Sequence, residues 1–295
     1  LALAAGFGTY ATLNMLVNIG NNRYRLIDFW TGTYRAATGS GALNTLPISV
    51  APYAVKFEKR LPVKIMFLAL LFATIQYMFT LGTRTQFAIL LLIVILAALQ
   101  FAYSEQGIAG VLKCIGIMAV ISLIAFLLYH FNVLSIREYI LNTNLAARYE
   151  RRASLENADS FRFQSFWIGL RELIQYPMGG RASQIYRHNM WLDVGRVSGI
   201  IPFCLLLVYS IKNFANVTVI WKNTKILPSL RYLLLFLYIG AYVNCFVEPI
   251  WEGALNFFLA LCVVDGMVSA MMRRLENHPT PEESVPDTSN LHADL

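Results

Sequence analysis

The sequence predicts an all-α, polytopic integral membrane protein, and its composition and hydropathy pattern both support that fold class. Of its 295 residues, 57% are hydrophobic and only 14% are charged, whereas soluble domains are about 45–50% apolar and about 25% charged. The mean hydropathy is +0.54. Uncharged stretches recur along the whole length, so we expect one membrane domain, residues 1–275, rather than two soluble domains.

About eight segments are candidate transmembrane helices, because a spanning helix needs about 20 mostly apolar residues. The uncharged stretches lie at 1–22, 36–55, 65–83, 85–104, 114–136, 197–211, 232–247 and 253–264. The last three are shorter, and each can extend past a flanking charge. In this interpretation Asp265 lies near the cytoplasmic end of the last span. Leu1 already belongs to an apolar run, so we expect earlier membrane segments before it.

The lysines predict the orientation of these helices. All of them fall in connections that an alternating path places on one side of the membrane: Lys56, Lys59, Lys64, Lys113, Lys212, Lys222 and Lys225. By the positive-inside rule that side is cytoplasmic. The tail at 276–295 is rich in proline and polar residues, and we expect it to be disordered and cytoplasmic.

The opposite side holds a long arginine-rich segment, about residues 137–188. It contains eight arginines, five acidic residues and no lysine. A guanidinium group offers a planar fork that binds phosphate oxygens in pairs, whereas an ammonium group acts as a point charge. The segment therefore predicts an anion-binding region, with a solvated loop of arginine-biased composition as the alternative.

Two ionisable residues on this side stand before apolar runs. Arg84 lies where one span ends and the next begins, and an ionisable group at such a depth is costly and usually functional. Its alternative role is to extend along the apolar surface to the membrane interface. His188 precedes the run that starts at 197, and an imidazole is a natural general base near neutral pH. The alternative for His188 is a purely structural role.

An amphipathic helix on the membrane face is expected from Ser160 onward. Ser160 can cap the helix, and "YPMGG" at 176–180 ends it. Its apolar stripe has helical spacing and consists of Phe163, Trp167, Leu170 and Ile174. Arg162 falls in the first turn, where a positive charge opposes the helix macrodipole. A ligand therefore explains Arg162 better than helix stability does.

Three sequence blocks occur in order: "LGTRTQFAILLLIVILAAL", "FRFQSFWIGLRELIQYPMGG" and "HNMWLDVGRVSGIIPFCLLL". They present an arginine before a long apolar helix, an Arg-x-x-x-x-Trp helix running into Pro-x-x-Gly, and His-Asn-x-x-Leu with Gly199 eleven residues after the histidine. This order resembles the superfamily of bacterial O-antigen ligases and O-antigen repeat-unit polymerases. "TYRAATGSGALNTLPISVAPYAV" is also similar to the segment that precedes this core. One departure is Arg196, where many relatives carry an acid; the nearby acid here is Asp193.

The resemblance implies a reaction, its location and the residues that carry it out. It implies metal-independent, inverting glycosyl transfer on the periplasmic side of the bacterial inner (cytoplasmic) membrane, without a cofactor. The donor would be a glycan linked to undecaprenyl diphosphate. Arg84 and Arg162 would bind the donor diphosphate, with Arg187 and Arg181 as further candidates, and His188 would be the catalytic base. The acceptor-side candidates are Asn189, Asp193, Glu248 and Glu252, although the two glutamates could instead close a turn around Pro249.

Two reactions of that superfamily fit the sequence. A ligase transfers a finished polysaccharide to lipid A–core in lipopolysaccharide biosynthesis, and the third block together with two upstream arginines favours it narrowly. A polymerase extends a growing glycan on the lipid carrier. The competing class is a transporter or flippase for an anionic lipid-linked glycan, whose signature would be charges or broken helices at mid-membrane. The net charge of +7 suits anionic lipid at the bilayer surface and requires no nucleic acid.

Overall fold

The chain is helical almost throughout. The structure is a computed structural model, and it describes residues 1–18, 25–153 and 158–277. Its helices are α1 Ala2–Val17, α2 Ala37–Ala42, α3 Thr45–Phe57, α4 Leu61–Leu81, α5 Arg84–His130, η1 Val133–Ser135, α6 Ile136–Leu141, α7 Asn144–Ala153, α8 Ala158–Gln175, α9 Met190–Ser198, α10 Ile200–Lys222, α11 Pro228–Val247, α12 Ile250–Gly253 and α13 Leu255–Asn277. Two short strands, β1 Arg25–Ile27 and β2 Tyr34–Ala36, pair antiparallel. The tail predicted from residue 276 lies almost entirely outside the described residues.

Among the described residues, five helices are long and apolar enough to cross a membrane. They are α4, α5, α10, α11 and α13, and they contain 20 to 47 residues each. α1 and α3 are also mainly apolar but have only 16 and 13 residues. The predicted all-helical, multi-pass membrane fold is confirmed in this general form.

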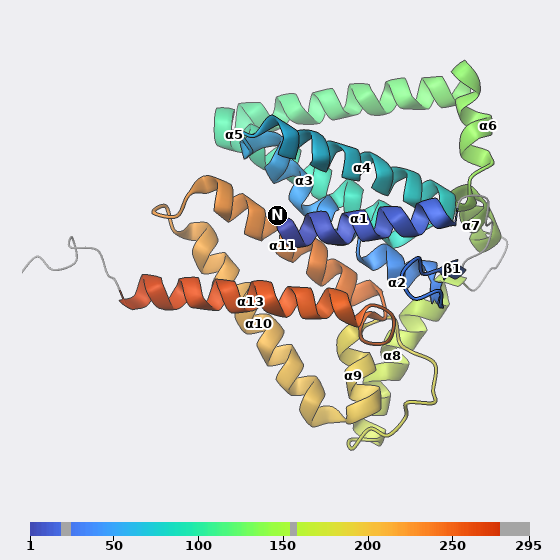
Figure 1. Ribbon diagram of the computed structural model, residues 1–295, viewed down its shortest axis with the longest axis vertical. Coiled ribbons are helices and arrows are strands. Elements are labelled where there is room, and N and C mark those ends of the chain that lie inside the picture. Colours follow the sequence, from blue (N-terminus) through green and yellow to red (C-terminus); the bar gives the residue numbers. More distant parts are fainter. Residues whose placement is uncertain (19–24, 154–157, 278–295) are drawn as a thin grey trace, which may run out of the picture.

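The longest helix, α5, bends sharply at Gly107, where φ is 60° and ψ is −143°. Glycine adopts this conformation because it has no Cβ. The chain then turns back so tightly that a Cβ on Gly110 would lie 2.3 Å from the carbonyl oxygen of Ala102. α5 therefore has two arms, residues 84–106 and 108–130, and their turn lies at the upper left of Figure 1.

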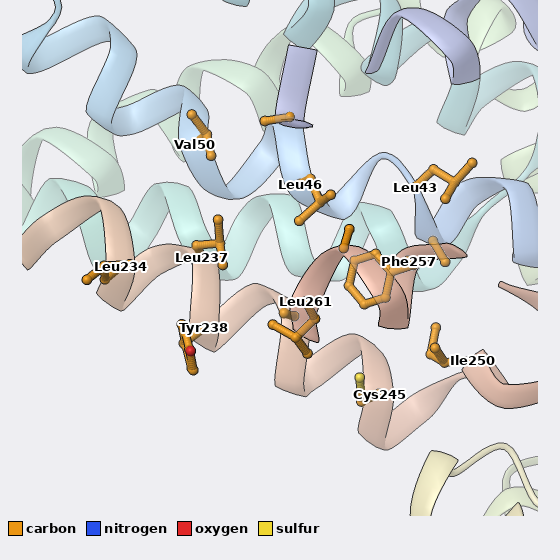
Figure 2. Packing of buried hydrophobic residues seen from close by; sticks show 14 of the residues in the cluster. Leu43, Leu46, Val50, Leu234, Leu237, Tyr238, Cys245, Ile250, Phe257 and Leu261 are labelled. Carbon is orange, nitrogen blue, oxygen red and sulfur yellow. The ribbon is translucent and has the colours of Figure 1, made fainter. Parts of the chain in front are cut away.

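The main hydrophobic core lies where α3, α11 and α13 meet. Figure 2 shows Leu46 and Val50 of α3 and Leu234 and Leu237 of α11 gathered between these two helices, with Phe257 of α13 nearby. α11 also contacts α5, α9 and α10. It is therefore the central helix of the fold.

α3 and α11 approach each other closely because glycine stands at their contact. A Cβ on Gly240 would lie only 2.1 Å from the hydroxyl oxygen of Ser49, and Ser49 itself donates to the carbonyl oxygen of Thr45. Close packing of this kind leaves little freedom for the C-terminal half of α11. That half leads directly to the candidate site.

The two ends of the molecule carry different basic residues. At the left of Figure 1 lie the connection between α10 and α11 and the last turns of α13, and we call this the lysine end after Lys222 and Lys225. At the right lie α2, α6 and α7. We call the right the arginine end, because α5 begins there with Arg84.

The position of Asp265 corrects one expectation. The sequence placed it near the end of the last span, but α13 continues to Asn277, so Asp265 lies close to the middle of the helix. Its side chain is buried and accepts a hydrogen bond from the Tyr238 hydroxyl on α11. Because the carboxyl group has a partner inside the protein, it does not end the apolar helix.

Candidate active site

A cavity of about 450 Å³ lies at the arginine end, between α8, the segment before α9 and the end of α11. Phe163 and Phe166 of α8, Phe246 and Val247 of α11, and the consecutive residues 187–189 line it. Most of its wall is aromatic or aliphatic, and its polar groups come from one short stretch of chain. Apolar pockets with a few convergent polar groups are the usual form of small-molecule sites.

Asn189 joins α9 to α11. Its side-chain oxygen accepts from the backbone N–H of Leu192 at 3.1 Å and so caps α9. Its side-chain nitrogen donates to the carbonyl oxygen of Phe246 at 3.2 Å. The oxygen and the nitrogen of the Asn189 amide thus hold the start of α9 against the last turn of α11. This places His188 beside the cavity.

His188 has a strained backbone. Its φ is 53°, in the left-handed region that non-glycine residues rarely adopt. Its ring lies edge-on to Tyr186, with 4.7 Å between the ring centroids, and its Nδ1 atom is buried. Strain of this kind tends to occur at functional sites, where the surrounding structure maintains it.

Arg187 and Arg181 both contact one carboxylate, that of Glu172 on α8. The Arg187 guanidinium donates from Nε at 3.0 Å and from Nη2 at 2.7 Å. Arg181 lies 3.7 Å from the same carboxylate and stacks over Tyr176 at 4.1 Å. The charge of Arg187 is therefore balanced within the protein, and an anion at this position would compete with Glu172.

Arg196 contacts the segment that leads to His188. Its guanidinium forms an ion pair with Glu252 of α12 and lies 3.7 Å from Asp193. Asp193 is buried, and it accepts from the backbone N–H of Arg187 at 2.6 Å. Burial raises the pKa of Asp193, while that N–H and the Arg196 charge oppose the rise. Asp193 and Glu252, both predicted to face the acceptor, are thus engaged with Arg196.

The first residues of α5, Arg84 and Thr85, lie near the end of α11. Arg84 begins α5, and its guanidinium lies 5.8 Å from the ring centre of Tyr149 on α7. The neighbouring Thr85 donates from its hydroxyl to the buried carboxylate of Glu248, the residue that follows α11. The start of α5 is therefore tied to the same end of α11 as Asn189.

Arg162 belongs to α8, but its side chain lies outside the described residues. The helix begins at Ala158, slightly before the predicted cap at Ser160. The residue after Arg162, Phe163, lines the cavity. Trp167 and Ile174 of the predicted stripe are exposed. Arg162 thus directly precedes a cavity-lining residue along α8.

Two residues of the site were not anticipated from the sequence. Glu172 was counted only as one of five acids, and Arg196 only as a departure from a motif. No local signal in the sequence distinguishes Glu172, because its pairing with Arg187 depends on how α8 packs on α9. Among the described residues, no three His, Cys, Asp or Glu side chains are grouped as metal ligands.

A scan against protein-family models found no match, and neither did a search of curated proteins.

Proposed function

We propose that this cavity is the active site of a metal-independent, inverting glycosyltransferase whose donor is a glycan on undecaprenyl diphosphate. The observation that carries the proposal is the placement of His188. It is a strained imidazole at the wall of an apolar cavity, and the end of α11 links it to the arginine at the start of α5. Transfer from a lipid diphosphate requires a base for the acceptor hydroxyl and guanidinium groups for the diphosphate.

The proposed reaction assigns one role to each group. The acceptor hydroxyl attacks C1 of the donor sugar from the face opposite the diphosphate, and His188 takes the hydroxyl proton. The C1–O bond to the diphosphate breaks as the new glycosidic bond forms, so the anomeric centre inverts. The leaving diphosphate gains negative charge, which Arg84 and Arg162 neutralise. Undecaprenyl diphosphate then leaves along the lipid-facing side.

The acceptor in this proposal is lipid A–core, which makes the protein an O-antigen ligase. The polymerase of the same superfamily, which extends a growing glycan, is the second candidate. The proposal includes eight membrane crossings, by α1, α3, α4, the two arms of α5, α10, α11 and α13. The arginine end then faces the periplasm, and the lysine end faces the cytoplasm of a bacterial inner membrane.

One observation favours the rival function, transport of a lipid-linked glycan. Asp265 is a buried carboxyl group near the middle of α13, and ionisable groups at mid-membrane are typical of transporters. Transport without transfer would require Asp265 but not His188. Measuring both glycan transport and glycan transfer for Asp265→Asn and for His188→Ala therefore separates the two functions.

The direct test is transfer by the purified protein in lipid nanodiscs, with an undecaprenyl-diphosphate glycan and either lipid A–core or a second donor molecule as acceptor. We expect His188→Ala to lower the rate by about 10²–10⁴-fold, because general-base catalysis contributes that much, while donor binding persists. His130→Ala is the matched control, since His130 is exposed at the end of α5. Wild-type transfer by His188→Ala would rule out the base. Product on lipid A–core supports the ligase, and ladders on the carrier support the polymerase.

A further inference from the structure

Arg196 is a charged residue in an enclosed position. It lies in the last turn of α9, and only 1% of its side chain is exposed. Removing a guanidinium from water is costly unless its donors are satisfied. The contacts of its two terminal nitrogens therefore show what holds this part of the fold together.

Three of those contacts are carbonyl oxygens from one turn of chain. Nη1 of Arg196 donates to the carbonyls of Arg181, Ala182 and Gln184 at 2.6, 3.1 and 2.8 Å. Nη2 bonds Glu252, so the same side chain also holds α12. One guanidinium thus joins three separate parts of the chain: α9, α12 and the segment 181–187.

The other attachments of segment 181–187 lie at its two ends, where the side chains of Arg181 and Arg187 contact Glu172. At its start the backbone N–H of Arg181 donates to the carbonyl of Arg196 at 3.1 Å. At its end the N–H of Arg187 donates to Asp193. Several of its residues, such as Ile185, are exposed. Arg196 supplies the contacts to the middle of the segment, and His188 follows directly after it.

We propose that Arg196 is a positioning residue that orders segment 181–187 and thereby holds His188 in its left-handed conformation. Its effect on transfer rests on the proposed function, but its effect on the order of the segment does not. Arginine suits this role because its fork reaches carbonyl oxygens and a carboxylate at once, whereas lysine offers a single nitrogen. The ion pair with Glu252 adds α12 to the same arrangement.

The first test measures hydrogen exchange of the 181–187 amides in the full chain in nanodiscs. Arg196→Gln should speed exchange by at least about tenfold, because the carbonyl contacts of the turn are lost. Arg196→Lys should give an intermediate rate, and Glu252→Gln, which removes only the ion pair, a smaller change in the same direction. Arg171→Gln is the control, since Arg171 is exposed on α8. Unchanged exchange in Arg196→Gln and Glu252→Gln would overturn the proposal.

The second test measures transfer kinetics of the same variants. We expect kcat to fall by about 10–100-fold in Arg196→Gln with KM within about threefold, since a displaced base slows chemistry more than binding. Partial recovery of kcat in Arg196→Lys supports positioning. A rise in KM with unchanged kcat would contradict it. If Arg196→Gln does not fold, Glu252→Gln decides by both measurements. If the wild type transfers no glycan, the proposed function fails, and exchange alone still tests the ordering role.

Discussion

Some basic residues at the two ends of the molecule differ in how deeply they are buried. At the lysine end Lys222, Lys225 and Arg273 are exposed. At the arginine end the side chains of Arg187 and Arg196 are 10% and 1% exposed, and each contacts a carboxylate. The first set can interact with a bilayer surface, whereas the second holds the protein chain together.

This difference changes the interpretation of the arginine-rich segment. Its lack of lysine indicated anion binding, because only guanidinium forms paired hydrogen bonds with phosphate. The same geometry serves the internal carboxylate of Glu172, which Arg187 binds through two nitrogens. Part of the arginine bias therefore has a structural cause. Arg84 and Arg162 carry the diphosphate-binding role in the proposed reaction.

The largest effect is expected for Arg187. Arg187→Ala leaves Glu172 buried without its closest partner, and such a change costs about 3–5 kcal/mol of stability. Thermal unfolding of the purified protein would show it as a lower midpoint. The double variant Arg187→Ala/Glu172→Gln should recover much of the loss, and Arg273→Ala at the lysine end should stay within about 0.5 kcal/mol. Equal stability of the single and double variants would contradict the pairing.

A smaller effect is expected when Arg84 or Arg162, the arginines proposed to bind the diphosphate, is replaced by lysine. Arg84→Lys and Arg162→Lys keep the charge but lose the fork, so kcat should fall by about 10–100-fold, somewhat less than for removal of an oxyanion donor. The same replacement at Arg273 should leave transfer unchanged. Normal rates in both Arg84→Lys and Arg162→Lys would show that charge alone suffices to bind the diphosphate. The replacement would then have the same effect on transfer at both ends of the molecule.

The smallest effect is a pH dependence at Glu58, between α3 and α4. Hydrogen bonds from the Arg60 side chain and backbone lower the pKa of Glu58 to about 2 from 4.5. Because the folded-state pKa is lowered, the stabilisation is present above pH 4.5 and is lost as the pH falls toward 2. Unfolding midpoints of the wild type and Glu58→Gln should therefore converge over that range. A constant difference between them would contradict the pairing with Arg60.

The sequence predicted the helices better than their contacts. Apolar length located the helices, and "YPMGG" marked the end of α8, because these signals are local. Arg187 and Glu172 are 15 residues apart, and their pairing follows from the packing of α8 on α9. Asp265 was misplaced because a charge was assumed to mark a helix end, whereas Tyr238 on another helix accommodates it. The role of Arg162 in binding the diphosphate stays a prediction, because its side chain lies outside the described residues.

The bend at Gly107 leaves the second arm of α5 with an unusual surface. Beyond Gly107, Gly110 is the only buried residue up to His130, and side chains such as Leu112, Ile121 and Phe126 are exposed around the whole helix. A helix that is apolar on every side is normally covered either by a protein core or by the hydrocarbon of a membrane. Bilayer hydrocarbon, rather than contacts with the rest of the described chain, therefore covers this arm, and loss of lipid should disturb its position first.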